Sequence, residues 1–228
     1  LMGVTYGVTP PSLRFINRHF LKMRCLEVFC GTKSVSKELP LHWEVVSIDI
    51  LPKFQPTILA DIATWDYTVF PPGHFDYIHC SPPCTEFSRA LTSRPRRLAD
   101  GDVLVQRSLE ILSYFKPRWW TLENPVGLLQ TRPYMEDLLE FRCFVCYCKY
   151  NEGAHRYRKQ TAIWTNLPWN PRPMCNKATP CPDKALHGKH IHHAQQGAPP
   201  GLRKTQAQLY SFPPALAREW VATMTSLG

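Results

Sequence analysis

Long apolar segments are missing from the 228-residue sequence, and their absence narrows the class of protein. No run of about 18 apolar residues is present that could cross a bilayer, so we expect no membrane partner. Residues 1–20 lack the continuous apolar stretch of a secretory signal, which favours an intracellular protein. No Gly-x-Gly-x-x-Gly loop occurs, and this argues against a dinucleotide-dependent oxidoreductase. Internal repeats are absent as well.

Acidic residues are in the minority: 18 Asp and Glu stand against 27 Lys and Arg, a formal net charge of +9. Such a balance favours a polyanionic partner, because cations displace the counterions condensed on phosphates. A protein that merely happens to be basic fits the charge about equally well. The nine cysteines are an odd number, so free thiols or a metal site in a reducing compartment are expected rather than a disulfide framework.

Apolar residues make up 44% of the chain, enough for one substantial folded domain. Short apolar runs bounded by turn residues predict buried strands, and apolar residues at helical spacing predict helices. The strands are expected at residues 24–29, 44–50, 57–61, 75–80, 119–123, 141–150 and 161–165, and the helices at 34–39, 102–115, 134–139 and 214–224. Strands that alternate with helices or loops in this order indicate an α/β domain with a mostly parallel sheet.

The character of the sequence changes at Leu167. Residues 167–202, called the insert below, are rich in proline and histidine and show no periodicity, which predicts a loop-rich segment. We therefore expect a core of residues 1–166, the insert, and a C-terminal segment of residues 203–228 whose helix returns to the core.

Residues suited to binding a small polar ligand follow three of the predicted strands. In open parallel sheets, ligands bind at the carboxyl ends of the strands. Phe29 and Gly31 flank a turn where glycine lets the backbone approach a ligand closely. Asp49 could accept hydrogen bonds from ribose hydroxyls, and Asp61 could accept one from an adenine amino group. A single aspartate after a strand is more commonly a turn or capping residue, so these positions point to a ligand only as a set.

The segment Ser81-Pro82-Pro83-Cys84 predicts a nucleophile. Its two prolines restrict the backbone and place Cys84 in a partly exposed turn at the end of a strand. A thiolate in such a turn suits covalent catalysis, whereas a cysteine in general is more commonly a small buried apolar residue. A second strand ends in Glu123-Asn124, which taken alone would indicate only a turn with capping residues.

Together these motifs, in this order, resemble those of the cytosine-C5 DNA methyltransferase family. The resemblance covers most of residues 24–166, and its most specific part is the pair Pro83-Cys84 and Glu123-Asn124. His155-Arg156-Tyr157-Arg158 resembles the arginine motif of the family, and Phe212-Pro213-Pro214 resembles its terminal element, which returns to the cofactor site. The resemblance implies a Rossmann-like methyltransferase fold that binds S-adenosylmethionine and methylates cytosine in double-stranded DNA.

The resemblance also implies roles for individual residues. Cys84 would add to carbon 6 of a flipped-out cytosine while Glu123, with Arg158 nearby, engages N3. The residues expected at the cofactor are Phe29, Gly31, Asp49, Asp61 and Pro83. The residues expected at nucleic acid are Ser88, Arg89, Arg94, Arg96, Arg97 and Arg156. Arginines of this kind can simply form a solvated surface, but their position beside the nucleophile favours contacts with phosphates.

Cysteines and histidines of the insert have a spacing that could bind zinc. The predicted ligands are Cys175, Cys181, His187 and His190. His192 or His193 could replace either histidine. A small segment without its own core would gain order from a metal, whereas the alternative is a basic loop that becomes ordered only on DNA. The short insert leaves little room for target recognition, so a homodimer or a partner subunit is a further expectation.

Two other functions remain open from the sequence. An RNA cytosine-C5 methyltransferase of the tRNA type would share the arrangement of Pro83-Cys84 and Glu123-Asn124. A catalytically inactive, DNA-binding accessory protein would be free to lose Cys84, Glu123 and Arg158, and the presence of all three argues against it. Cytoplasm and nucleus are both compatible locations, and so is a virus-encoded protein.

Overall fold

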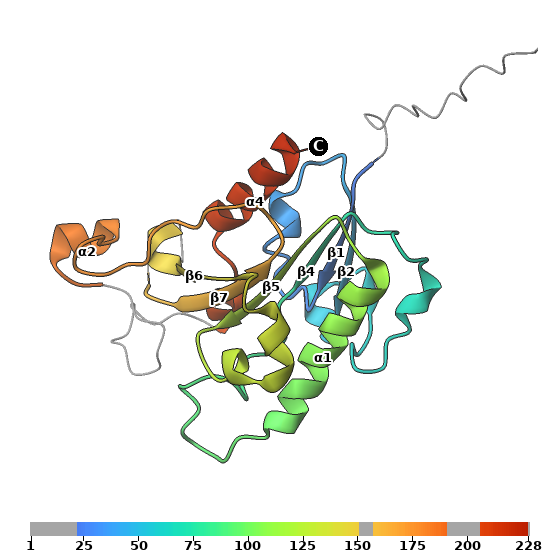
Figure 1. Ribbon diagram of the computed structural model, residues 1–228, viewed down its shortest axis with the longest axis horizontal. Helices are drawn as coiled ribbons and strands as arrows, with labels where there is room; N and C mark the ends of the chain where they lie inside the picture. The colour runs from blue at the N-terminus through green and yellow to red at the C-terminus, as the bar shows by residue number, and fades with distance from the viewer. Residues whose placement is uncertain (1–21, 151–156, 191–205, 228) are drawn as a thin grey trace, which may run out of the picture.

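The computed structural model describes residues 22–150, 157–190 and 206–227, which form a seven-stranded sheet flanked by helices (Figure 1). The strands are β1 (Arg24–Val28), β2 (Glu44–Asp49), β3 (Ile58–Leu59), β4 (Tyr77–Cys80), β5 (Trp119–Pro125), β6 (Arg142–Cys146) and β7 (Gln160–Thr165). They lie in the order β3-β2-β1-β4-β5-β7-β6. All strands run in one direction except β7, which is antiparallel to both β5 and β6. The sheet confirms the expected α/β fold of the Rossmann-like methyltransferase type.

Two long helices cover the sheet, and shorter helical segments connect the strands. The α-helices are α1 (Leu98–Phe115), α2 (Pro182–His187), α3 (Gln206–Tyr210) and α4 (Pro214–Ser226). The 3-10 helices are η2 (Ser36–Glu38), η3 (Pro52–Phe54), η4 (Tyr67–Val69), η5 (Leu129–Thr131), η6 (Pro133–Leu138) and η7 (Tyr147–Tyr150). α1 ends where Lys116 adopts a left-handed conformation and Pro117 cannot continue the helix. Among the described residues, no helix has the length and apolarity needed to cross a membrane.

Alternating side chains of the strands build one core on each face of the sheet. On one face, Cys25 of β1 belongs to a core that includes Leu216 and Trp220 of α4. On the other face, the next residue, Leu26, belongs to a core that includes Ile111 and Phe115 of α1. The apolar strands predicted from the sequence are therefore buried on both sides, as is typical of a parallel sheet.

The strand order reverses between β1 and β4. These two central strands are parallel neighbours, with Val28 paired to Cys80, and the chain leaves them toward opposite halves of the sheet. Such a reversal opens a crevice at the carboxyl ends of the strands, where ligands of this architecture bind. Ser81 Oγ donates to Phe29 O across this position at 3.2 Å, which joins segments 52 residues apart.

Three predicted elements differ in kind over all or part of their length. The helix expected at residues 34–39 is only the single turn η2, because Pro40 follows before an α-helix can propagate. The helix expected at residues 134–139 is likewise the 3-10 segment η6. The strand expected at residues 141–150 ends at Cys146 and continues as η7, whose buried side chains do not alternate as those of a strand would.

Candidate active site

A cavity of about 370 Å³ lies at the carboxyl ends of β1, β2, β4 and β5. Its size falls within the range of ~300–1,000 Å³ typical of small-molecule sites. The predicted site residues that line it are Phe29, Gly31, Asp49, Pro83, Cys84 and Glu123. Tyr210 and Phe212, near the C-terminus, also line it, so the terminal element returns to the cavity. Residues from five separate parts of the sequence therefore meet at one place.

One wall of the cavity is the turn after β1, which is held in place by the buried carboxylate of Asp49 at the end of β2. Phe29 and Gly31 both have positive φ, 58° and 46°. A left-handed conformation is uncommon for a residue as bulky as phenylalanine and tends to occur at ligand sites. Asp49 Oδ2 accepts a hydrogen bond from Gly31 N at 2.9 Å, and its Oδ1 accepts one from Leu51 N at 2.9 Å. Each carboxylate oxygen can accept a further bond from a ligand hydroxyl.

Glu27 lies under the same turn, although its position inside a strand did not single it out in the sequence. Its carboxylate accepts hydrogen bonds from Val35 N and Ser36 N, both at 3.2 Å, and it lines the cavity. Burial raises the pKa of Glu27, and these hydrogen bonds oppose that effect. Together with Asp49 it gives this wall an acidic character.

The Pro-Pro-Cys segment is tied to the strand beside it. Asn124 Nδ2 donates to Pro82 O at 3.0 Å, and Asn124 is fully buried at the end of β5. Hydrogen bonds inside a protein are electrostatically stronger than those in water, so this bond restrains the turn that carries Cys84. Cys84 itself is half-buried and lies on the cavity wall. The asparagine of the Glu-Asn pair thus positions the predicted nucleophile.

A close backbone contact holds the loop that follows Cys84. Leu128 N donates to Phe87 O at 2.9 Å, which brings the segment after β5 against this loop. A Cβ atom at Gly127 would lie 2.3 Å from Phe87 O, so no side chain fits at this position.

Two thiols line the cavity, and their surroundings differ. Cys30 is only 5% exposed, and burial, with the charges of Glu27 and Asp49, raises its pKa to about 12. Burial raises the pKa of Cys84 too, the positive charge of Lys159 lowers it and the charge of Glu123 raises it, so the pKa stays above its ordinary value. Cys84 differs from Cys30 in combining access with a nearby cation, which favours a thiolate.

Glu123 lies at the cavity with two polar neighbours and is 7% exposed. Tyr147 OH donates to Glu123 Oε1 at 3.1 Å, and Lys159 Nζ lies 3.7 Å from the same oxygen. Lys159 Nζ also donates to Leu209 O at 3.2 Å and lies 4.7 Å from the centre of the Tyr147 ring. The sequence did not single out Tyr147 or Lys159; the run of basic residues before β7 was the available signal for the lysine.

Two predicted site residues lie away from the cavity. Arg158 is exposed and is absent from the cavity lining, whereas Lys159 lies beside Glu123, where the sequence placed Arg158. Consecutive residues of an extended segment point to opposite sides, and the sequence does not reveal which of the two faces inward. Asp61 is exposed too, and its Oδ1 accepts a hydrogen bond from Ala63 N at 2.9 Å. It closes a turn, as isolated aspartates commonly do.

Two arginines of the loop after Cys84 maintain the shape of the loop. Arg94 Nη1 donates to Glu86 Oε2 at 3.0 Å, and Arg96 Nη2 donates to Ser88 O at 2.9 Å. The hydrogen bonds from Arg94 and from Arg97 N lower the pKa of Glu86 to about 2. The guanidinium of Arg94 is thus engaged within the protein by a carboxylate that stays ionised.

The other predicted contacts with nucleic acid are more accessible. Arg89 is exposed. Arg97 is 69% exposed, and its Nε lies 3.2 Å from Asp100 Oδ2. Pairs as open as this contribute little to stability, so Arg97 can exchange its partner for a phosphate. Arg156 lies outside the described residues.

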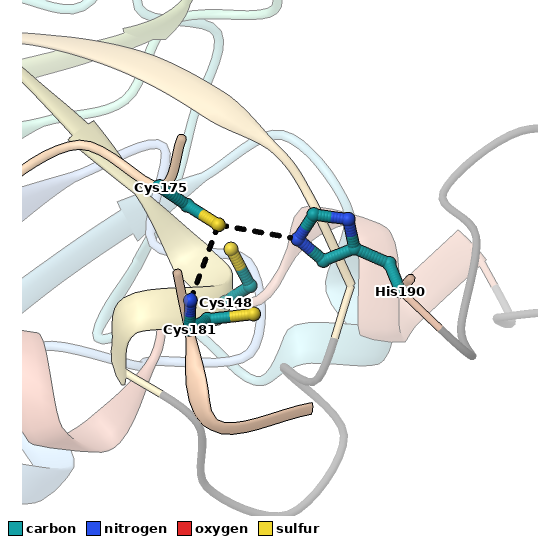
Figure 2. A group of neighbouring side chains, drawn as sticks. All are labelled: Cys148, Cys175, Cys181 and His190. Atoms are coloured by element: carbon teal, nitrogen blue, oxygen red, sulfur yellow. Dashed lines mark hydrogen bonds between the residues drawn. The ribbon is translucent and has the colours of Figure 1, made fainter. Parts of the chain in front are cut away.

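A group of metal-ligating side chains lies apart from the cavity (Figure 2). It consists of Cys148, Cys175, Cys181 and His190, whose ligand atoms all lie within 4.8 Å of one another. Three of these residues are among the ligands predicted from the sequence. The fourth predicted ligand, His187, is exposed at the end of α2, and Cys148 of η7 occupies its place in the group. The sequence placed Cys148 on a separate strand, so only the fold reveals its proximity.

Two solved structures are similar to part of this chain. One is a DNA modification methyltransferase encoded within an E. coli prophage, with 12% identity and a TM-score of 0.45, covering 63% of this chain and 46% of that chain. The other is the Entamoeba histolytica methyltransferase EhMeth, with 13% identity and a TM-score of 0.48, covering 69% of this chain and 57% of that chain. The chain thus spans about half the length of these solved proteins.

Sequence comparisons find similarity to cytosine-specific DNA methylases. A profile described as C-5 cytosine-specific DNA methylase matches residues 51–141, which include Cys84 and Glu123. A relative from Frog virus 3 (isolate Goorha), named "Probable DNA (cytosine-5)-methyltransferase", is 28% identical over 218 residues. That match covers 86% of this chain and 98% of the relative. Over residues 51–141 the chain is thus similar to the C-5 cytosine-specific DNA methylase family, and over most of its length it is similar to the viral relative.

Proposed function

We propose that the protein transfers a methyl group from S-adenosylmethionine to carbon 5 of cytosine in double-stranded DNA, with Cys84 as the nucleophile. The observation that carries this proposal is the meeting of Cys84 and Glu123 at one cavity whose walls also include the turn after β1. Similarity to the C-5 cytosine-specific DNA methylase family and the name of the viral relative support the choice of cytosine in DNA. A virus-encoded origin agrees with the same relative.

The residues of the cavity fit S-adenosylmethionine. Ile50, Leu51 and Phe54 provide apolar surface suited to an adenine ring, and Asp49 can accept hydrogen bonds from ribose hydroxyls. The acidic wall that includes Glu27 suits a ligand that carries positive charge. When bound, S-adenosylmethionine supplies an electrophilic methyl group.

Cys84 and Glu123 divide the chemistry of the base between them. The Cys84 thiolate forms a bond to carbon 6 of cytosine while the Glu123 carboxyl group, acting as a general acid, passes a proton to N3, which neutralises the negative charge that develops on the ring. The electron pair thus shifts to carbon 5, which takes up the methyl group. Loss of the carbon-5 proton to solvent then releases an electron pair that re-forms the bond between carbons 5 and 6 as a double bond and expels the Cys84 thiolate, and N3 returns its proton to Glu123.

Lys159 supplies the cation of the site in this proposal. Lys159 Nζ lies 3.7 Å from Glu123 Oε1, close enough to hold this side chain in position, and its charge favours the thiolate form of Cys84. This is the position for which the family resemblance suggested Arg158, and the geometry supports the lysine.

DNA would bind with the target base turned out of the helix, because a stacked base cannot enter the cavity. The net charge of +9 suits a phosphate backbone. Arg89 and Arg97, exposed on the loop after Cys84, are the proposed phosphate contacts, whereas Arg94 and Arg96 maintain that loop. Binding should therefore weaken steeply as the salt concentration rises.

The test is covalent trapping on a duplex that contains 5-fluorocytosine, in the presence of S-adenosylmethionine. Fluorine cannot leave as a proton, so the adduct persists and shifts the protein on a denaturing gel. The shifted band should vanish in Cys84→Ser and persist in Cys143→Ser, a half-buried cysteine outside the cavity. Trapping on RNA alone would establish the tRNA-type alternative. Failure on both nucleic acids, together with failure to bind the cofactor, would establish the accessory role.

A further inference from the structure

We propose that Cys148, Cys175, Cys181 and His190 bind a structural zinc ion that fastens the insert to the catalytic domain. Cys148 belongs to η7, directly after β6, whereas the other three residues belong to the insert. In Figure 1, α2 of the insert lies at the edge of the molecule, beyond β6. The site is independent of the proposed methyl transfer.

The geometry of the group fits a tetrahedral metal site. Zinc–sulfur bonds of about 2.3 Å and zinc–nitrogen bonds of about 2.0 Å space tetrahedral ligand atoms about 3.5–3.8 Å apart. Cys175 Sγ and His190 Nε2 are 3.5 Å apart, and all four ligand atoms lie within 4.8 Å of one another. Figure 2 shows the three sulfur atoms and the imidazole ring gathered around a common space. Only small side-chain shifts separate this arrangement from coordination.

Apolar packing alone does not account for this cluster. Its buried members are all cysteines, Cys146 with the three thiol ligands, and Met174 packs against them. The cluster is separate from the two cores that flank the sheet. Thiols are small side chains that bury little apolar area, so they stabilise a loop-rich segment weakly by themselves. A metal supplies the order that a small segment without a core otherwise lacks.

Groups around the cluster suit the charge of a metal thiolate centre. Three thiolates and one Zn²⁺ leave a net negative charge. Cys181 N donates to Cys175 Sγ at 3.3 Å, a hydrogen bond that favours sulfur in its thiolate form. Lys149 of η7 brings a cation to the insert. Its Nζ donates to Thr179 O at 3.3 Å and to Pro180 O at 3.2 Å, in the segment that joins the two cysteines of the insert. Such contacts orient ligands and offset charge around metal sites.

The donor set selects zinc and a structural role. Three soft sulfur ligands with one imidazole are typical of tetrahedral zinc, and hard cations such as Mg²⁺ prefer oxygen ligands. Four protein ligands leave no open position for a reactive water. Cys146 Sγ lies 3.2 Å from Cys148 Sγ and is the neighbouring thiol that can donate to this ligand.

The same centre would steady the catalytic cavity, a consequence that rests on the proposed function. Tyr147 immediately precedes Cys148 in η7, and its hydroxyl donates to Glu123 at 3.1 Å. A metal bound to Cys148 therefore restrains the segment that orients the catalytic carboxylate.

The test measures metal directly on the full chain, purified without a polyhistidine tag. Elemental analysis should find one zinc per chain in the wild type and in His187→Ala, and almost none in Cys148→Ser or Cys175→Ser. His187 is the matched control, since it is an exposed histidine three positions from His190. Replacement of zinc by Co²⁺ should give the visible absorption of a tetrahedral centre together with sulfur-to-cobalt charge-transfer bands.

Each other outcome overturns part of the proposal. A folded wild-type chain that contains no zinc and gives no tetrahedral cobalt spectrum would eliminate the site. Full metal content in Cys148→Ser would show that Cys148 is not a ligand and that the metal does not join the insert to the catalytic domain. Loss of metal in His187→Ala would show that His187 is a ligand, as the spacing in the sequence predicted. If a cysteine variant fails to fold, the cobalt charge-transfer intensity of the wild type still counts the thiolates. None of these measurements depends on methyl transfer.

Discussion

Replacement of Lys159 by methionine should slow methyl transfer far more than the same replacement of its neighbour Arg158. The two residues are adjacent and carry the same charge, but only Lys159 lies at the cavity, close to Glu123 and Cys84. Methionine keeps most of the length and apolar character of the side chain, so the variant removes the charge while it retains much of the packing.

The geometry gives the expected size of the effect. Lys159 Nζ lies 3.7 Å from Glu123 Oε1, with side chains 17% and 9% exposed. Glu123 acquires its charge as its proton passes to N3, and two unit charges at about 4 Å interact by about 4 kcal/mol at an effective dielectric constant of ~20. Desolvation offsets part of this energy, and a net loss of about 2 kcal/mol in the transition state corresponds to a rate about 30-fold lower. The exposed Arg158 should change the rate at saturating DNA by less than about 3-fold.

The assay is single-turnover methyl transfer measured as a function of pH. Burial raises the pKa of Cys84 and Lys159 lowers it, so removal of the lysine raises this pKa further. The thiolate then forms only at higher pH, and the rising limb of the rate profile should move to higher pH in Lys159→Met. Alkylation of Cys84, followed by peptide mapping in the absence of DNA, should show the same displacement. Lys159→Arg should restore most of the rate.

The opposite ranking of the two variants would refute this assignment. If Arg158→Met impairs the rate and Lys159→Met matches the wild type in both rate and pH profile, the cation of the site is Arg158, as the family resemblance suggested. Thermal unfolding of both variants provides the control, because a folding defect in Lys159→Met would slow the reaction without displacing the pH profile.

Three further outcomes are expected. Asn124→Ala should lower the free energy of unfolding in urea by about 1–3 kcal/mol, because it leaves the Pro82 carbonyl without its donor, and kcat should fall about 10-fold or more as the Cys84 turn loosens. Asn166→Ala removes two hydrogen bonds at the other end of β5 and should lower stability but not kcat. Glu86 has its pKa lowered from 4.5 to about 2, so its contribution to stability is complete above about pH 4.5 and is lost as the pH falls toward 2. Melting temperatures should decline across that window in the wild type and less in Glu86→Gln. A zinc chelator should lower the melting temperature and expose the insert to proteases, whereas a chain that holds no metal would melt unchanged.

The sheet, and the position of Cys84 in a turn at the end of a strand, could be predicted from local sequence. Buried strands appear as short apolar runs, and two prolines before Cys84 restrict the backbone whatever surrounds them. The convergence of Phe29, Cys84 and Glu123 could be predicted as well, since parallel strands present their carboxyl ends at one edge of the sheet. The short helical segments were harder to predict, because η2 and η6 are single turns whose form depends on the residues they pack against.

The metal group shows the limit of prediction from spacing. Cys175, Cys181 and His190 are close in sequence and were found together, whereas Cys148 is separated from them by β7 and the start of the insert. A spacing pattern within one segment cannot include a ligand from another element. His187 satisfied the pattern but lies exposed on α2.

The sequence by itself determined the kind of fold, the resemblance to cytosine-C5 DNA methyltransferases, and the presence of a thiol and a carboxylate at strand ends, because these follow from periodicity and from short motifs. Only the tertiary structure decided which charged residue stands beside the carboxylate and which fourth side chain completes the group of potential metal ligands. Lys159 and Arg158 differ by one position in an extended segment, and the direction of each side chain depends on how β7 is placed against β5. Cys148 reaches the insert only because β6 and η7 bring it there. Both outcomes depend on packing between elements distant in sequence, which no local pattern encodes.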